Sequence, residues 1–133
     1  MKLRTTPAHI IDLRPNECFV FGSNQRGIHG KGAARTAIKW GAIPGQGVGR
    51  AGSTYALPTC LSPGMPLPLD FIQVHVDAFI AHAAHSPETT FLVTEVGCGL
   101  AGYKPSQIAP MFVNAMQYDN IHLPELFWHI LAL

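Results

Sequence analysis

Residues 18–40, CFVFGSNQRGIHGKGAARTAIKW, decide the fold class. The first seven residues, CFVFGSN, predict a short buried strand over Cys18–Asn24, because the FVF run favours β structure and Gly22 interrupts it. The glycine-rich run that follows leads into alanines at helical spacing, and Gly41 stands where a C-terminal cap belongs, so we expect a helix over 32–40. A strand, a glycine loop and a helix in this order are typical of an anion site in an α/β protein.

The same arrangement returns late in the chain. FLVTEV predicts a buried strand over Phe91–Val96, and GCGLAGY follows it directly. Pro105 suits the first position of a helix, although Pro110 interrupts its middle. The apolar face expected for this helix consists of Ile108, Ala109, Phe112, Val113 and Met116. Glycine lets a ligand approach backbone N–H groups closely, so two such loops predict a cradle for phosphate.

The segments between the two loops complete an alternation of strands and helices. A strand is expected over 54–57, ending at Pro58, and a proline-rich connection follows it along the surface. Asp70 is the predicted N-cap of the next helix, with Gln73 at the capping-box position. A short strand is expected at 121–123. The sequence therefore predicts an α/β fold with helices on both faces of the sheet. The buried stripe of the middle helix is expected to be Ile72, Val76, Phe79, Ile80 and Ala83.

Length and composition fit one folded domain spanning residues 1–133. Hydrophobic residues make up 47% of the chain and charged residues 13%, against roughly 25% charged in average soluble proteins. This composition is typical of a compact domain and excludes a disordered chain.

Charge is distributed unevenly along the chain. Residues 18–69 contain no Asp or Glu but five basic residues, so this segment carries +5. The other four basic residues stand against all eight acids, which leaves the rest of the chain at −4 and the total at +1. A local positive field of this kind attracts a compact anion, whereas a pI of about 7.8 disfavours long nucleic acid as a partner. The five basic residues are Arg26, Lys31, Arg35, Lys39 and Arg50.

The cysteines and histidines give no sign of a metal or disulfide framework. Cys18, Cys60 and Cys98 form an odd set without CxxC spacing, which favours a reducing, cytoplasmic location. His82 and His85 are three residues apart on the middle helix, but no third ligand stands in register with them. We therefore expect neither a metal nor a cofactor.

Membrane association is not expected either. The longest charge-free stretch, 51–69, contains four prolines and is incompatible with a membrane-spanning helix. A monomer or a weak dimer is the expected oligomeric state, since no pairing of the cysteines is required.

Two well-known nucleotide-binding patterns do not fit. GCGLAG at 97–102 matches GxGxxG, but GVGRAG at 47–52 matches it equally without a strand before it. A Rossmann unit also needs an acid at the end of the next strand, and Asp119 precedes the predicted strand instead. GIHGKG lacks both the glycine spacing and the Ser or Thr of a P-loop. We therefore expect the phosphate to be bound by a fold other than a Rossmann unit or a P-loop.

FGSN, HGKGAARTA, STYALPT and VGCGLAGYKPSQIAPMF, in this order over residues 18–113, resemble the macro-domain superfamily, whose members bind ADP-ribose. The resemblance implies a three-layer α/β/α fold with a mixed central sheet. It also implies that ADP-ribose, or a related nucleotide diphosphate, is the small-molecule partner. In that superfamily the first glycine loop opens a helix and the late loop wraps the diphosphate.

The resemblance assigns roles to individual positions. Asn24 takes the place that faces the distal ribose, and Asp12, with Glu17 as its competitor, takes the place of the acid that contacts adenine. The loop positions that correspond to the superfamily's ligand contacts are Gly30, Lys31, Gly32, Ala33, Gly97, Cys98, Gly99, Leu100, Ala101, Gly102 and Tyr103.

Several of these residues also have purely structural interpretations. His29 stands at the helix entrance and either donates to a phosphate or is an exposed loop residue, and we favour the ligand contact. Asn24 is also suited to close its own loop turn. Cys98 is either a nucleophile of depressed pKa or, as we favour, a small loop-filling residue. Tyr103 either covers the cleft or packs beneath its loop.

The nearest subgroup contains the terminal ADP-ribose protein glycohydrolase and the antitoxins that reverse DNA ADP-ribosylation. Its hydrolases carry a lysine just after the YALPT-like strand and an aspartate after the GCGL-like turn, where this chain has Cys60 and Ala101. We therefore expect binding with little or no hydrolysis. The alternative is an ADP-ribosyl hydrolase that uses Asn24, Lys31 or a positioned water. A third possibility is an interaction protein of the same fold in which the loops are only turns.

Overall fold

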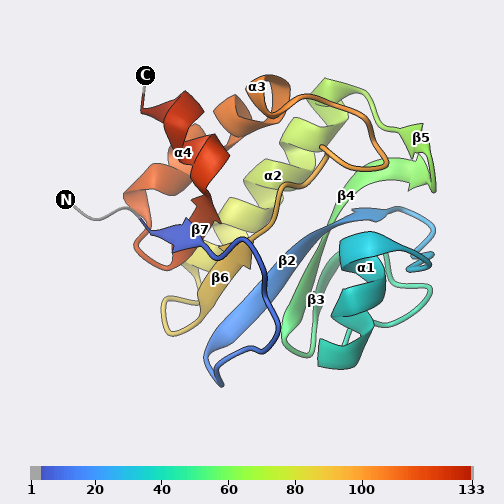
Figure 1. Ribbon diagram of the computed structural model, residues 1–133, viewed down its shortest axis with the longest axis horizontal. Coiled ribbons are helices and arrows are strands. Elements are labelled where there is room, and N and C mark those ends of the chain that lie inside the picture. Colours follow the sequence, from blue (N-terminus) through green and yellow to red (C-terminus); the bar gives the residue numbers. More distant parts are fainter. Residues whose placement is uncertain (1–3, 133) are drawn as a thin grey trace.

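The computed structural model describes residues 4–132, and within this range a seven-stranded sheet is flanked by helices (Figure 1). The strands are β1 (Thr5–Thr6), β2 (Glu17–Asn24), β3 (Gly49–Ala51), β4 (Thr54–Ser62), β5 (Met65–Pro66), β6 (Thr90–Val93) and β7 (Ile121–Pro124). The α-helices are α1 (Gly32–Ala37), α2 (Leu69–Ala84), α3 (Pro105–Ile108) and α4 (Glu125–Leu131), and two 3₁₀ helices are η1 (Ile38–Trp40) and η2 (Ala109–Gln117).

The sheet is mixed, as expected. Its strand order is β1-β7-β6-β2-β4-β3, with β5 added to β4. In this order, every neighbouring pair from β1 through β7, β6 and β2 to β4 is parallel. β3 and β5 both pair antiparallel with β4. The five parallel strands β1, β7, β6, β2 and β4 are consecutive in the sheet, so their carboxyl ends lie along one edge of it.

Alternating side chains on β2 separate the two faces of the sheet. Cys18 and Val20 belong to the larger core beneath α2, α4 and η2, whereas Phe19 and Phe21 belong to a smaller core with the alanines of α1. Figure 1 shows the same division, with α2, α3 and α4 on one side of the sheet and α1 on the other. The predicted α/β fold with helices on both faces is therefore confirmed.

Helix α2 buries the predicted stripe but begins differently. Ile72, Val76, Phe79, Ile80 and Ala83 are all buried. The N-cap is Pro68, which makes no side-chain capping hydrogen bond, so the predicted capping box of Asp70 and Gln73 is wrong. Asp70 instead lies in the first turn, where its carboxylate interacts favourably with the positive end of the helix dipole.

Two strand ends differ from the prediction. β4 continues past Pro58 to Ser62. Along β4, the pairing with β3 covers Thr54 to Ala56 and the pairing with β5 covers Cys60 to Ser62, so Pro58 lies between them and pairs with neither. β6 stops at Val93 and not at Val96. The next residue, Thr94, directs both its N–H and its hydroxyl to the Val20 carbonyl, and Val20 is the last β2 residue that pairs with β6.

The segment after Pro105 is a short α-helix that tightens into the 3₁₀ helix η2 at Ala109, beside Pro110. Three residues per turn rotate the apolar face relative to an α-helix. Val113 and Met116 are consequently exposed, contrary to prediction, while Met111 and Ala115 are buried.

In residues 4–132 no helix combines the length and the apolar character that crossing a bilayer requires.

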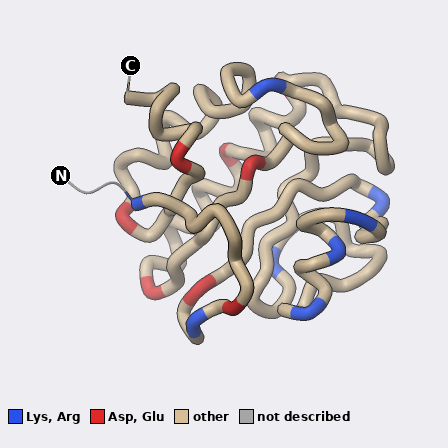
Figure 2. Tube along the Cα trace, in the orientation of Figure 1, with Lys and Arg blue, Asp and Glu red and all other residues tan. Residues whose placement is uncertain are grey.

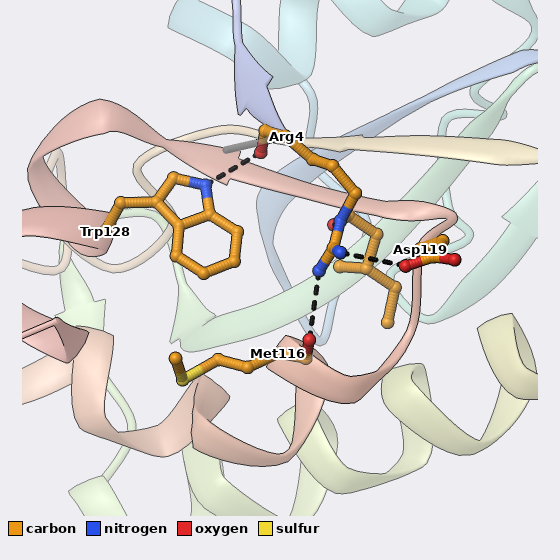
Figure 3. A network of polar contacts seen from close by, with 5 residues as sticks. Arg4, Met116, Asp119 and Trp128 are labelled. Atoms are coloured by element: carbon orange, nitrogen blue, oxygen red, sulfur yellow. Dashed lines mark hydrogen bonds and ion pairs between the residues drawn. The ribbon is translucent and has the colours of Figure 1, made fainter. Parts of the chain in front are cut away.

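Arg4 joins the amino-terminal segment to the last strand and helix (Figure 3). Its guanidinium donates to the Ile121 carbonyl at 3.3 Å, to the Met116 carbonyl at 3.1 Å and to Asp119 at 3.1 Å. The Trp128 indole N–H donates to the Arg4 carbonyl at 2.7 Å, and the guanidinium lies 5.5 Å from the centre of that ring. These contacts hold β1 against β7 and fix where the following residues 7–16 begin.

The Arg4→Lys variant is expected to lower the free energy of unfolding by about 1–2 kcal/mol, because an ammonium cannot fork to two carbonyls and a carboxylate. Asp119→Asn should leave that free energy unchanged within error, since the Asp119 side chain is fully exposed. Urea unfolding of both variants measures the difference. An equal loss of unfolding free energy in the two variants would show that the Arg4–Asp119 ion pair, and not the contacts to the carbonyls, holds the amino-terminal segment.

Candidate functional site

A cleft of about 660 Å³ lies at the carboxyl ends of β2, β4 and β6. Both glycine-rich loops line it, the first from the end of β2 to α1 and the second after β6. The parallel pairing of these strands brings together loops that are about 70 residues apart in the sequence. Open α/β sheets commonly bind ligands at this edge.

Asn24 closes the first loop. Its side-chain amide donates to the Ile28 carbonyl at 2.8 Å, and its carbonyl oxygen accepts from the Ile28 N–H at 3.0 Å. Asn24 is only 7% exposed, although it lines the cleft. The resemblance assigns Asn24 to the ribose, and both polar atoms of its side chain already hold the loop in shape.

A neighbouring loop supports the first loop from behind. A Cβ on Gly27 would lie 2.3 Å from the Gly45 carbonyl carbon, and one on Gly47 would lie 2.2 Å from the Asn24 carbonyl oxygen. The Gly45 N–H also donates to the Gly27 carbonyl at 2.8 Å. Gly27 and Gly47 therefore allow the backbones of the two loops to pack closely, and neither residue lines the cleft.

Residues with unpaired backbone N–H groups line the cleft on both sides. The N–H groups of Gly30, Lys31 and Gly32 donate no hydrogen bond to another described residue. The same holds on the facing wall for the N–H groups of Gly99, Leu100 and Ala101. Because helix α1 has only six residues, its dipole adds little, and these individual N–H groups are the main attraction for an anion.

The second loop has a rigid base and an open rim. Gly97 has a φ of +78°, and a Cβ there would lie 2.9 Å from the Ile108 side chain. Tyr103 donates its N–H to the Gly97 carbonyl and its hydroxyl to the Leu67 carbonyl, so it packs beneath the loop. Gly99, in contrast, has open space where a Cβ would be.

A third wall comes from the β4–β5 hairpin, none of whose residues was predicted to contact the ligand. Thr59, Cys60, Pro63 and Gly64 line the cleft. The expected end of β4 at Pro58 would have left these residues in a surface connection. The hairpin therefore places Cys60 in the cleft by extending the strand past the proline.

Charge in the cleft is sparse. Lys31 and Glu95 are the charged side chains among the described residues that line it. Figure 2 shows the basic residues of the 18–69 segment gathered around α1 and its loops. Two of these cations are engaged elsewhere, since Lys39 donates to the Ile11 carbonyl and Arg50 donates to the Gly52 carbonyl. The positive segment thus contributes one basic side chain, Lys31, to the lining of the cleft, and its other basic residues contribute positive electrostatic potential around it.

Neither cysteine near the cleft is an activated nucleophile. Burial raises the pKa of the Cys60 thiol, and hydrogen bonds from neighbouring groups offset this only in part. Burial, with a smaller contribution from the Glu95 carboxylate, raises the pKa of Cys98 to about 11. Both are therefore neutral thiols near pH 7, and the alternative of a depressed pKa at Cys98 is wrong. All three cysteines are free.

Most, but not all, of the predicted contact residues line the cleft. Asp12 is exposed and outside it, and the buried His29 ring stacks edge-on against Phe21 at 5.4 Å. Cys98 and Tyr103 pack against the larger core, and Gly102 also lies outside the lining. The predicted residues that line the cleft are Asn24, Gly30, Lys31, Gly32, Ala33, Gly97, Gly99, Leu100 and Ala101.

Both histidines of the pair on α2 contact other parts of the protein. The His82 ring packs between Tyr55 and Phe91, and burial lowers its pKa. His85 bonds to the Ala81 carbonyl through Nδ1. Across residues 4–132 no three side chains of His, Cys, Asp or Glu are grouped so that they could hold a metal ion.

No protein-family model matches the chain, and comparisons with curated proteins and with solved structures find no match.

Asn24→Ala is expected to lower the free energy of unfolding by about 2 kcal/mol, because it removes both hydrogen bonds that close the first loop. Asn114→Ala is the matched control, since Asn114 is exposed on η2 and its side chain bonds to no described residue. Urea unfolding and amide hydrogen exchange of residues 25–31 measure the effect. An Asn24→Ala variant as stable as the parent would mean that Asn24 is free to serve the ligand alone.

Proposed function

We propose that this protein binds ADP-ribose, or a related nucleotide diphosphate, in the cleft between the two glycine-rich loops, with little or no hydrolysis. The observation that carries the proposal is the row of unpaired N–H groups on the two facing walls. A diphosphate presents oxygen acceptors on both sides, so it can satisfy both rows at once.

The size and composition of the cleft agree with this ligand. A volume of about 660 Å³ falls within the usual range of small-molecule sites. Lys31 supplies one positive charge, and no bulky side chain separates a ligand from the backbone at Gly30 or Gly99. The resemblance to macro domains points to ADP-ribose independently, through the order of the four motifs.

The chemistry of the cleft favours binding over turnover. Cys60 and Ala101 both line it at the positions where the resembling hydrolases carry lysine and aspartate. The Cys60 thiol has a raised pKa, and alanine has no group that transfers a proton. Asn24 is bonded to Ile28 through both of its polar atoms, which limits its ability to position a water.

Calorimetric titration with ADP-ribose tests the proposal. The parent protein should bind, and Gly30→Val and Gly99→Val should each bind at least about tenfold more weakly, because the added side chain blocks the backbone donors. Neither glycine has a positive φ and neither has a neighbour within 4 Å of a Cβ, so both variants should fold. Ala78→Val, on the exposed surface of α2, is the control and should bind like the parent.

Absence of binding by the parent, or parent-like affinity in both glycine variants, would overturn the proposed site. Incubation with a mono-ADP-ribosylated protein should release ADP-ribose no faster than buffer alone. Multiple turnovers that depend on Lys31 would favour the hydrolase alternative.

A further inference from the structure

A second cavity, of about 880 Å³, adjoins the loop cleft on the α1 side of the sheet. Both cavities are lined by Ala33, Thr94 and Glu95, which therefore mark their junction. Residues 5–11 form the outer wall of the second cavity. A ligand that fills the loop cleft and extends past Glu95 must enter this second space.

The two cavities differ in charge. Apart from Glu95, which lines both cavities, the loop cleft offers Lys31 and the unpaired N–H groups, which suit an anion. Among the described residues that line the second cavity there is no Lys or Arg, whereas Glu95 and Glu125 are both present. Glu125 lies 3.7 Å from His129, but the Glu95 side chain forms no hydrogen bond or ion pair with another described residue. Glu95 therefore presents a free carboxylate at the junction.

We propose that Glu95 is a specificity-determining residue, which selects a ligand that is uncharged just beyond the diphosphate and rejects one that is phosphorylated there. This inference rests on the proposed function. The carboxylate accepts hydrogen bonds from neutral sugar hydroxyls, whereas a phosphate at the same place would face it as a like charge. ADP-ribose carries a ribose on each side of its diphosphate. Its nucleoside end is the larger one and fits the larger, second cavity, so the portion that passes Glu95 is the ribose of the nucleoside.

The test compares the affinities of ADP-ribose and 2′-phospho-ADP-ribose, which differ by one phosphate on the nucleoside ribose. In low-salt buffer at pH 8, the parent should bind ADP-ribose about tenfold more tightly than the phosphorylated ligand. Glu95→Gln should reduce this ratio to about threefold or less, because it keeps the size and acceptor oxygen but removes the charge. Glu88→Gln, an exposed acid outside both cavities, should leave the ratio unchanged.

Salt provides a second readout that a purely structural role of Glu95 would not change. Because Glu95 is exposed, the parent's ratio should fall as the salt concentration rises, and the ratio of Glu95→Gln should not. Equal binding of both ligands by the parent, or equal weakening of both by Glu95→Gln, would overturn this inference and leave the proposed function standing. If the parent binds neither ligand, both are overturned.

Discussion

Strand β2 pairs in parallel on both sides, with β4 through Phe19–Asn24 and with β6 through Glu17–Val20. This pairing fixes where the carboxyl ends of three strands meet, and both glycine loops and the β4–β5 hairpin begin there. It also divides the core, because successive β2 side chains face α2 on one side and α1 on the other. The cleft exists because these segments, distant in sequence, share one sheet edge.

The parts of the fold that the sequence predicts correctly have local causes. The FVF run, the glycines after it and the alanines of α1 each specify their conformation within a few residues, so β2, the first loop and α1 were predicted. The buried stripe of α2 follows from helical spacing alone. Nine predicted contact residues line the cleft because they follow directly from strand ends.

The parts that were missed depend on contacts between distant segments. β1, β3 and β5 have two or three residues each, and their pairing with β7 or β4 has no periodic signature. A proline ends a strand only where the neighbouring strands on both sides need its backbone N–H as a donor, and Pro58 pairs with neither β3 nor β5. His29 turns inward because Phe21 lies beneath it, and Glu95 gains its position from the early end of β6. Asp12 lies outside the cleft, and its position in the sequence, just before β2, did not predict this.

The most direct test of the account is a titration of the isotope-labelled protein with ADP-ribose, followed by amide chemical shifts. The account predicts saturable shifts at Gly30–Gly32 and Gly99–Ala101, whose N–H groups would change from unpaired to phosphate-bonded. The amides of α2 should stay unchanged, because α2 lies on the other side of the sheet from α1. Shifts confined to other surfaces, or none at millimolar ligand, would contradict it.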